Sequence, residues 1–348
     1  MNTFLEELST WVELSGEALC AAEDGLVVLQ NRVAVQLLGD HRGESLSSLL
    51  PDCPMFEGDG SFAATLPGDH GALSIRGMRK QGVTLLNITP TDPPRVLLTQ
   101  RTLAALRNNL FLLQLPAERL LSALPEKEDD LYAASMRHAY YALRRLLDDF
   151  SDLDAVGTGT LALNSKPLDL AAACHLLIDT VRCLLDEGAP VITEEYIGEC
   201  VVNGDRRRLE QVLMCLLSSA LLRAAPDSHI RIRLSRREEK VLLTLEDDGA
   251  AVSPEQLKGM FSMGDDAPDS TLGTGLGLVL AWNLVQLHGG RTIVESREEQ
   301  GTRVHVELPA SSALPLRDAG EDVPPMSDVL TQMSAALTHR AYRKRYTE

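Results

Sequence analysis

Two stretches of regularly spaced apolar residues constrain the fold of this 348-residue chain more than any other feature. Between residues 95 and 154 the spacing alternates between three and four, the a/d rhythm of helices that pack along a seam. The seam residues are Leu103, Leu106, Leu110, Leu113, Ala117, Leu120 and Leu124, then Met136, Ala139, Leu143, Leu146, Phe150 and Leu153. A polar turn at 125–130 predicts a helix hairpin, in which Pro116 kinks the first helix. Because two helices cannot enclose a core, we expect two chains to form a four-helix bundle.

A small α/β unit is predicted before the hairpin. It begins with an apolar run at 25–29 and a short helix at 33–38 that ends at Gly39. The strands expected next are Phe62–Leu66, Ala72–Arg76 and Val83–Ile88, separated by turn residues.

Helix and strand patterns alternate after Pro167, which favours a helical layer against one sheet. The expected elements are helices over Asp169–Glu187 and Arg207–Ala224, strands at 191–194, 230–234 and 241–245, a Gly-rich segment that opens a helix, and a hairpin at 293–308. The residues from 313 to 325 predict a linker, and Asp328–Lys344 predicts a short helix that ends in a basic cluster.

Composition excludes several classes of protein. The net charge of −17 disfavours nucleic acid and anionic lipid as main partners. No apolar run is long enough for a membrane span, and the N-terminus lacks the pattern of a signal peptide, so we expect a cytoplasmic protein. The six cysteines lack C-x-x-C spacing, which predicts reduced, mostly buried thiols and no zinc site.

One segment carries the pattern of a phosphate-binding loop. Glycines at the start of a helix let backbone N–H groups approach an anion. The residues concerned are Gly273, Thr274, Gly275, Leu276 and Gly277. The dinucleotide-binding fingerprint is not matched, because no strand leads directly into this loop.

With the sequence around Asp247 upstream and the hairpin downstream, this loop resembles that of the sensor histidine kinases. The resemblance implies an α+β multidomain chain whose ATP-binding domain is a Bergerat-type α/β sandwich, the fold of Hsp90, gyrase and MutL. The implied domains are a PAS-like sensor domain at 1–92, a dimerisation helix hairpin at 93–156, the ATP-binding domain at 157–310, and a linker with a C-terminal helix at 311–348.

The resemblance implies a nucleotide site with substitutions. Asp247 stands at the adenine-binding aspartate and Gly249 at the first glycine of the same motif, and the Gly-rich loop completes the set that binds ATP or ADP. The second glycine of the motif is Ala251. Cys215 and Ser219 replace two asparagines, the second of which holds Mg²⁺ in the family. A lid at 263–272 carries Asp265, Asp266 and Asp269 but no lysine or arginine. The resemblance therefore predicts weak nucleotide binding without productive Mg²⁺.

The phosphoacceptor is also substituted. The family's nucleophilic histidine aligns with Ala104, on the outward side of the helix, and its acidic neighbour aligns with Ala105. Asn108 falls where related sensors carry a residue thought to orient a hydrolytic water. We interpret His138 as a surface histidine rather than a replacement acceptor and His288 as a helix cap.

His175 lacks further metal ligands in the sequence, so we expect no metal site. The leading hypothesis is a dimeric signalling protein that binds nucleotide, has lost autophosphorylation, and regulates a response regulator or another histidine kinase. The alternatives are an active kinase with another acceptor, a response-regulator phosphatase, and a scaffold that binds no nucleotide.

Overall fold

The computed structural model describes residues 17–49, 60–68, 71–80, 82–90, 104–110, 131–250, 276–297, 301–313 and 323–343, together with positions 9, 12, 13, 15, 102, 112, 113 and 252. The lid at 263–272, Ala251, Gly273, Thr274, Gly275, Cys53 and most of the first seam lie outside the described residues.

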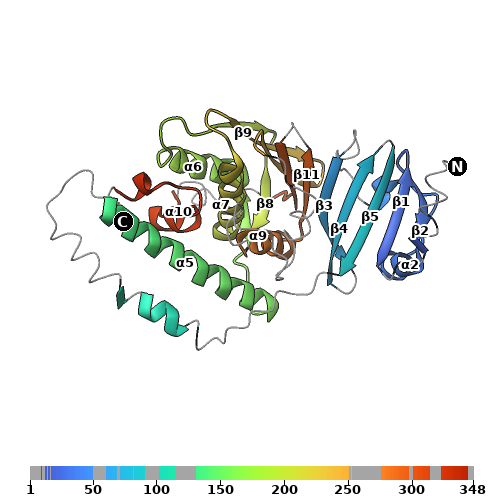
Figure 1. The fold of residues 1–348 in the computed structure, drawn as a ribbon, viewed down its shortest axis with the longest axis horizontal. Helices are drawn as coiled ribbons and strands as arrows, with labels where there is room; N and C mark the ends of the chain where they lie inside the picture. Colours follow the sequence, from blue (N-terminus) through green and yellow to red (C-terminus); the bar gives the residue numbers. More distant parts are fainter. Residues whose placement is uncertain are drawn as a thin grey trace.

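The N-terminal unit, residues 17–90, is an antiparallel sheet with one main helix (Figure 1). Its strands are β1 (Ala18–Glu23), β2 (Leu26–Gln30), β3 (Gly60–Gly68), β4 (Gly71–Lys80) and β5 (Val83–Pro90). Helix α2 (Arg32–Leu38) starts where the side chain of Asn31 accepts a hydrogen bond from the Ala34 amide, and it ends at Gly39, whose φ is +88°. A four-residue helix, α3 (Leu46–Leu49), follows. The strands and the helix predicted from the sequence are confirmed.

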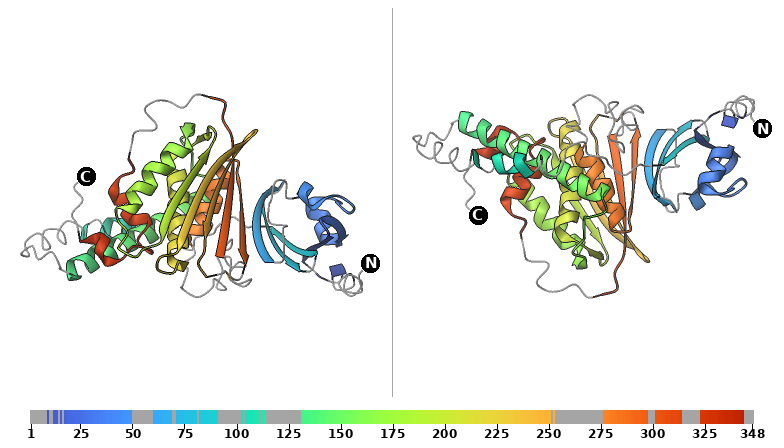
Figure 2. Two further views of the ribbon diagram at one scale, coloured as in Figure 1. Left: turned by 90° about the horizontal axis from the view of Figure 1, so that it is seen from above. Right: turned by 90° about the horizontal axis from the view of Figure 1, so that it is seen from below.

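The C-terminal unit, residues 166–313, is a helical layer on one face of a sheet, as expected (Figure 2). Its strands are β7 (Val191–Ile197), β9 (His229–Arg237), β10 (Lys240–Asp247), β11 (Arg291–Arg297) and β12 (Gly301–Pro309), and its helices are α6 (Leu170–Arg182), α7 (Arg206–Arg223) and α9 (Leu276–Leu287). A separate pair, β6 (Lys166–Asp169) and β8 (Val201–Gly204), lacks a predicted counterpart. Helix α6 ends five residues before the predicted Glu187, because the chain turns at Cys183–Leu185.

The two units share one ten-stranded sheet with the order β2-β1-β5-β4-β3-β11-β12-β10-β9-β7. The connection is the antiparallel pairing of β3 with β11, in which Ala63 lies opposite Val294 and Ala64 opposite Ile293. The two apolar cores meet at this pairing, since Ala63 belongs to the core of the C-terminal unit and Ile293 to that of the N-terminal unit. No pattern in the sequence indicates this connection.

Helix α5 (Leu131–Gly157) is the second helix of the predicted hairpin and packs against α9. The seam residues of this helix differ in their exposure to solvent. Met136 and Leu143 are 46% and 53% exposed, whereas Leu153 is fully buried in the core of the C-terminal unit. The prediction that Leu153 faces a partner chain is therefore wrong, because α9 and the rest of the chain's own core cover it. Of the first helix, residues 104–110 are helical, and Arg107 pairs with Asp148 of α5 at 2.6 Å.

The predicted single helix Asp328–Lys344 is also wrong. The chain forms α10 (Met326–Gln332) and then a separate 3-10 turn, η4 (His339–Tyr342). The side chain of Thr338 accepts a hydrogen bond from the Arg340 amide and starts this second turn, which competes with a continuous helix. Both segments pack on α5, and Tyr342 is completely buried. In the part of the chain that is described, no helix has the length and apolar character to cross a membrane.

Candidate functional site

The predicted adenine-binding carboxylate lies at the end of β10, next to the last turn of α7. Helix α7 is positioned by Asp205, whose side chain accepts a hydrogen bond from the Arg208 amide at the helix start. Its buried face points at the sheet, which brings Ser219 and Arg223 to the side of Asp247. Asp247 is 3% exposed, so its charge needs a partner inside the protein.

Arg223 is that partner. Its guanidinium donates to Asp247 Oδ2 at 2.6 Å and to Ser219 Oγ at 2.6 Å. The other carboxylate oxygen accepts from the Gly249 amide at 3.1 Å. Burial raises the pKa of Asp247, and the Arg223 charge opposes that effect. Each Asp247 oxygen thus already accepts one hydrogen bond from the chain's own donors, Arg223 and the Gly249 amide.

Gly249 makes this arrangement possible. A side-chain Cβ at this position would lie 2.7 Å from the carbonyl oxygen of Arg223 and 3.0 Å from Asp247 Oδ1. The glycine thus allows the end of α7 to approach the Asp247 loop closely. This role differs from the one implied by the resemblance, in which the glycine belongs to the nucleotide site.

The space next to Arg223 is small. The cavity there has a volume of about 10 Å³ and is lined by Leu216, Ser219, Arg223, Leu278, Trp282, Val294, Thr302 and Val304. A single water molecule needs a cavity of about 10–15 Å³ measured in this way. The side chains beside Arg223 thus leave room for at most one water, whereas a second cavity of about 300 Å³ is lined by Asp247, Asp248 and Thr302 among others. A purine base next to Arg223 therefore requires a rearrangement of these side chains.

The start of α9 lies where the resemblance places the phosphates. Leu276 and Gly277 form its first turn. A Cβ at Gly277 would lie 2.8 Å from Arg145 Nη2 and 3.4 Å from Cys215 Sγ, so side chains from α5 and α7 reach this glycine. Helix α5 therefore covers the described part of the predicted phosphate loop.

Asp149 of α5 is the second buried carboxylate here. It is completely buried, and its nearest cation is the Arg145 side chain, with a distance of 3.6 Å between Arg145 Nε and Asp149 Oδ2. Neither Asp149 oxygen has a hydrogen-bond partner. Burial raises the pKa of Asp149 to about 7, with Asp152 and Asp148 adding to the shift and Arg145 opposing it.

Ser219, the position to which the resemblance assigns Mg²⁺, and Cys215, one turn before it on α7, are poorly suited to the ion. Burial raises the pKa of the Cys215 thiol to about 12, so the sulfur stays protonated. Mg²⁺ prefers oxygen ligands in octahedral geometry. The Ser219 hydroxyl oxygen is already bonded to Arg223. The described residues therefore do not fit a Mg²⁺ ion held by α7.

The residues considered for phosphate transfer differ in how exposed they are. Ala104 and Asn108 are exposed on the first helix, as expected. His138 is half-buried rather than freely exposed. Its Nε2 bonds to the Ser334 carbonyl at 2.7 Å, and its ring packs against His339 and Tyr342 at centroid distances of 4.8 and 4.9 Å. The C-terminal segment thus covers the histidine that the alternative kinase mechanism requires.

His288 acts as a cap, as predicted. Its Nδ1 bonds to the Leu284 carbonyl at 2.7 Å, and its Nε2 accepts from the Asp205 amide at 3.0 Å. The ring therefore links the end of α9 to the start of α7. The described cysteines are free, and all except Cys183 are buried, as expected.

Three features of the site were missed by sequence reasoning: the covering of α9 by Arg145 and Asp149, the Arg223–Asp247 pair, and the place of Trp282 in the cavity. Arg145 and Asp149 are one helical turn apart and lie beside the apolar seam in the sequence. This spacing was the only feature of the sequence that could have indicated the pair. A further group of His175, Asp179 and Glu194 was also missed, because Glu194 reaches it from another element.

Residues 204–312 match the family described as histidine kinase-, DNA gyrase B-, and HSP90-like ATPases. Among curated proteins, histidine protein kinase DivJ of Caulobacter vibrioides is 29% identical over 182 residues, covering 51% of this chain and 30% of its own length. Signal transduction histidine-protein kinase BaeS of Escherichia coli is 29% identical over 180 residues, covering 51% of this chain and 38% of its own length. The match thus spans about a third of each relative.

The solved structure of full-length ShkA in complex with AMPPNP has a similar fold. It aligns with a TM-score of 0.52 at 22% identity, covering 63% of this chain and 48% of ShkA. Helices on one face of a sheet, the α7–β10 junction and the helix that begins at Leu276 all lie within or next to the matched region. Residues 204–312 therefore match the family model of histidine kinase-, DNA gyrase B- and HSP90-like ATPases and lie in a fold like that of ShkA, in a chain that is similar over about half its length to histidine protein kinases.

Proposed function

We propose that this chain is a histidine kinase-like signalling protein that has lost autophosphorylation and binds adenine nucleotide only weakly. The observation that carries the proposal is the buried ion pair between Arg223 and Asp247, the residue to which the resemblance assigns adenine binding. Substitution of the acceptor histidine by Ala104 and of the metal-binding asparagine by Ser219 supports the same conclusion. Phosphoryl transfer needs both a nucleophile and stabilised phosphate charge, and the chain lacks residues for each.

In this proposal the protein acts through its surface rather than through turnover. The N-terminal unit is a PAS-like sensor, and the pairing of β3 with β11 carries its state to the ATPase-like domain. The dimeric helix hairpin then presents a surface to a response regulator or to another histidine kinase. Such a mechanism requires two conformations that the signal stabilises to different extents.

Nucleotide binding tests the purine subsite directly. A purine that reaches Asp247 must leave the Arg223 guanidinium buried without its partner, which costs about 3–5 kcal/mol. Removing this side chain in Arg223→Ala removes that cost and opens the cavity. We expect isothermal titration calorimetry to show ADP binding that is at least about 100-fold tighter than in the parent chain, since about 1.4 kcal/mol corresponds to tenfold.

Two further variants control this experiment. Arg233→Ala removes an exposed arginine, paired with Glu195 at 2.8 Å, and should leave ADP affinity unchanged. Adding Asp247→Asn to Arg223→Ala should abolish the gain, because the charged carboxylate that accepts from the purine amine becomes a neutral amide, a weaker acceptor. Tight ADP binding by the parent chain, or equal affinities in the parent and a folded Arg223→Ala variant, would refute the proposed closure of the site.

Transfer of labelled phosphate from ATP tests the lost kinase. Ala104→His alone should give no acid-labile label, because several groups that act in one transition state are missing together. Label should become measurable only when the site is repaired as a whole, by Ala104→His, Ala105→Glu, Cys215→Asn, Ser219→Asn, Arg223→Ala and Ala251→Gly. Label on the parent chain, or equal rates for the single and the combined variants, would show that the chain is an active kinase.

A further inference from the structure

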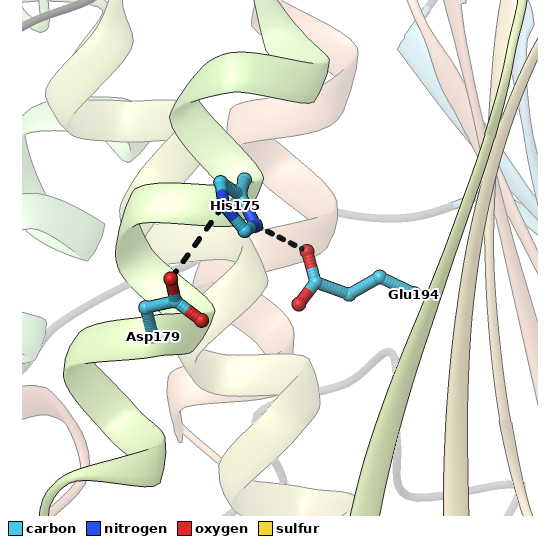
Figure 3. A group of neighbouring side chains, drawn as sticks. All are labelled: His175, Asp179 and Glu194. Atoms are coloured by element: carbon cyan, nitrogen blue, oxygen red, sulfur yellow. Dashed lines mark hydrogen bonds and ion pairs between the residues drawn. The ribbon is translucent and has the colours of Figure 1, made fainter.

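A group of potential metal ligands lies on the exposed side of α6 and β7, outside the ATPase-type site. His175 and Asp179 are one helical turn apart on α6, and Glu194 reaches them from β7, the last strand of the sheet (Figure 3). One ligand atom from each of the three residues lies within 4.8 Å of the other two. The His175 and Asp179 side chains are 55% and 52% exposed, so an ion can enter from solvent, whereas that of Glu194 is only 9% exposed and is held in place.

Arg182 orients the two carboxylates. Its Nη1 lies 2.7 Å from Asp179 Oδ1 and 2.6 Å from Glu194 Oε1. Its Nη2 donates to the Ile192 carbonyl at 2.8 Å, which fixes the guanidinium on β7. The arginine thus binds the outer oxygen of each carboxylate and leaves Asp179 Oδ2 and Glu194 Oε2 facing the imidazole. Tyr196 also donates to Glu194 Oε2. Such outer contacts are typical of carboxylates that hold metals.

The imidazole of His175 contacts both carboxylates at once. The distance from its Nδ1 to Glu194 Oε2 is 3.1 Å, and that from its Nε2 to Asp179 Oδ2 is 3.5 Å. A neutral imidazole carries a single N–H, so one of these contacts sets a nitrogen lone pair against a carboxylate oxygen. A positive charge at the open nitrogen, supplied by a metal ion or by a second proton, relieves this repulsion.

We propose that His175, Asp179 and Glu194 bind a divalent metal ion of the Zn²⁺ class. One imidazole nitrogen and two carboxylate oxygens suit a borderline cation such as Zn²⁺, whereas Mg²⁺ disfavours imidazole. Three protein ligands leave the remaining coordination position to water. The ion links α6 to the edge strand β7, and its charge offsets the two carboxylates that Arg182 neutralises only in part. This inference does not depend on the proposed loss of kinase activity.

The test uses the chain of residues 1–348 with Cys183 replaced by serine, because Cys183 is an exposed thiol that also binds zinc and follows Arg182 directly. Cys53, which lies outside the described residues, is replaced by serine as well. Titration with zinc chloride, followed by calorimetry, should show one ion per chain, and magnesium chloride should give no heat of binding. His175→Ala and Asp179→Asn each remove one ligand at an exposed position and should weaken zinc binding at least 10-fold. The melting temperature should rise more with zinc in the parent chain than in His175→Ala or Asp179→Asn.

His229→Ala is the matched control. His229 is also exposed and lies near one carboxylate, with 3.7 Å between its Nδ1 and Asp248 Oδ2. It is not part of the group of three potential metal ligands found among the described residues. Its loss should leave the zinc affinity unchanged. Absence of zinc binding in the parent chain, or equal zinc affinities in His175→Ala and His229→Ala, would overturn the proposal and identify the group as an ion-pair network around a protonated imidazole.

Discussion

Asp247 and Asp149 are both buried carboxylates, and they differ in how their charge is compensated. Asp247 has a direct ion pair with Arg223 at 2.6 Å and a backbone donor at Gly249. Asp149 has only Arg145, at 3.6 Å, and no hydrogen bond. A buried carboxylate without close partners favours its neutral form. Burial therefore raises the pKa of both carboxyls, to about 7 for Asp149, whereas at Asp247 the close Arg223 charge opposes the shift.

Asp149→Asn tests this difference. The folded-state pKa of about 7 lies above the ordinary value of 3.8, so the folded chain binds a proton here that the unfolded chain releases between about pH 4 and pH 7. The stabilisation is complete below about pH 4 and is lost as the pH rises through 7. We expect the parent chain to lose about 3 kcal/mol of unfolding free energy from this residue between pH 5 and pH 8.

Urea unfolding at the two pH values measures this loss, and Asp149→Asn should not show it. The control is Asp148→Asn, because Asp148 is partly exposed and paired with Arg107 and Arg144. An unchanged pH dependence in Asp149→Asn would mean that Asp149 stays ionised in the folded chain.

Individual residues were predictable to different degrees. The position of Asp247 at a strand end and the capping role of His288 follow from local pattern, and the structure places both as expected. The partner of Asp247 lies 24 residues away on another element, and no local pattern reports such a contact. The covering of His138 was not predictable for the same reason, since the segment that covers it lies about 200 residues further along the chain.

Among the elements, the C-terminal segment and α5 depend on each other. Tyr342 is buried against α5, its hydroxyl donates to the Leu330 carbonyl at 2.8 Å, and its backbone carbonyl accepts from Arg137 at 3.0 Å. Asp328 Oδ1 of α10 lies 3.4 Å from Arg144 Nη2 of α5. The segment therefore fastens α5 to the C-terminal unit by a buried aromatic ring and by polar contacts.

Tyr342→Ala should lower the free energy of unfolding by about 3–5 kcal/mol, because it leaves a cavity of aromatic size. Tyr342→Phe removes only the hydroxyl and should cost about 1 kcal/mol. Tyr132→Ala is the control, since Tyr132 lies on α5, the helix that Tyr342 packs against, and is 88% exposed. Equal unfolding free energies for Tyr342→Ala and Tyr132→Ala in urea would contradict the fastening role.

Elements with strong periodicity were predicted best. The strands and the helix α7 appear within four residues of their expected bounds, because alternating or helical patterns reflect burial on one side. The tail was predicted worst. Its apolar residues follow a helical spacing, but the side-chain cap at Thr338 starts a new turn instead.

For the whole molecule, the exposed seam of α5 predicts a dimer. Tyr132, Met136 and Leu143 remain exposed in a single chain, which favours burial against a second copy. Leu110→Asp combined with Leu143→Asp should convert a dimer into a monomer in light scattering. Leu287→Asp, a change at an exposed leucine of α9, should leave the dimer intact. A monomeric parent chain would rule out the predicted bundle.

The pairing of β3 with β11 also determines how the chain can be divided. Separating residues 17–90 from the rest would strip β11 of its neighbour and leave the amide and carbonyl groups around Ile293 and Val294 without partners. Bare strand edges of this kind recruit other strands. A fragment that begins at residue 131 would thus pair with its own copies, edge to edge. The oligomeric state measured for this fragment would result from the newly exposed edge of β11 and would not be that of the intact chain.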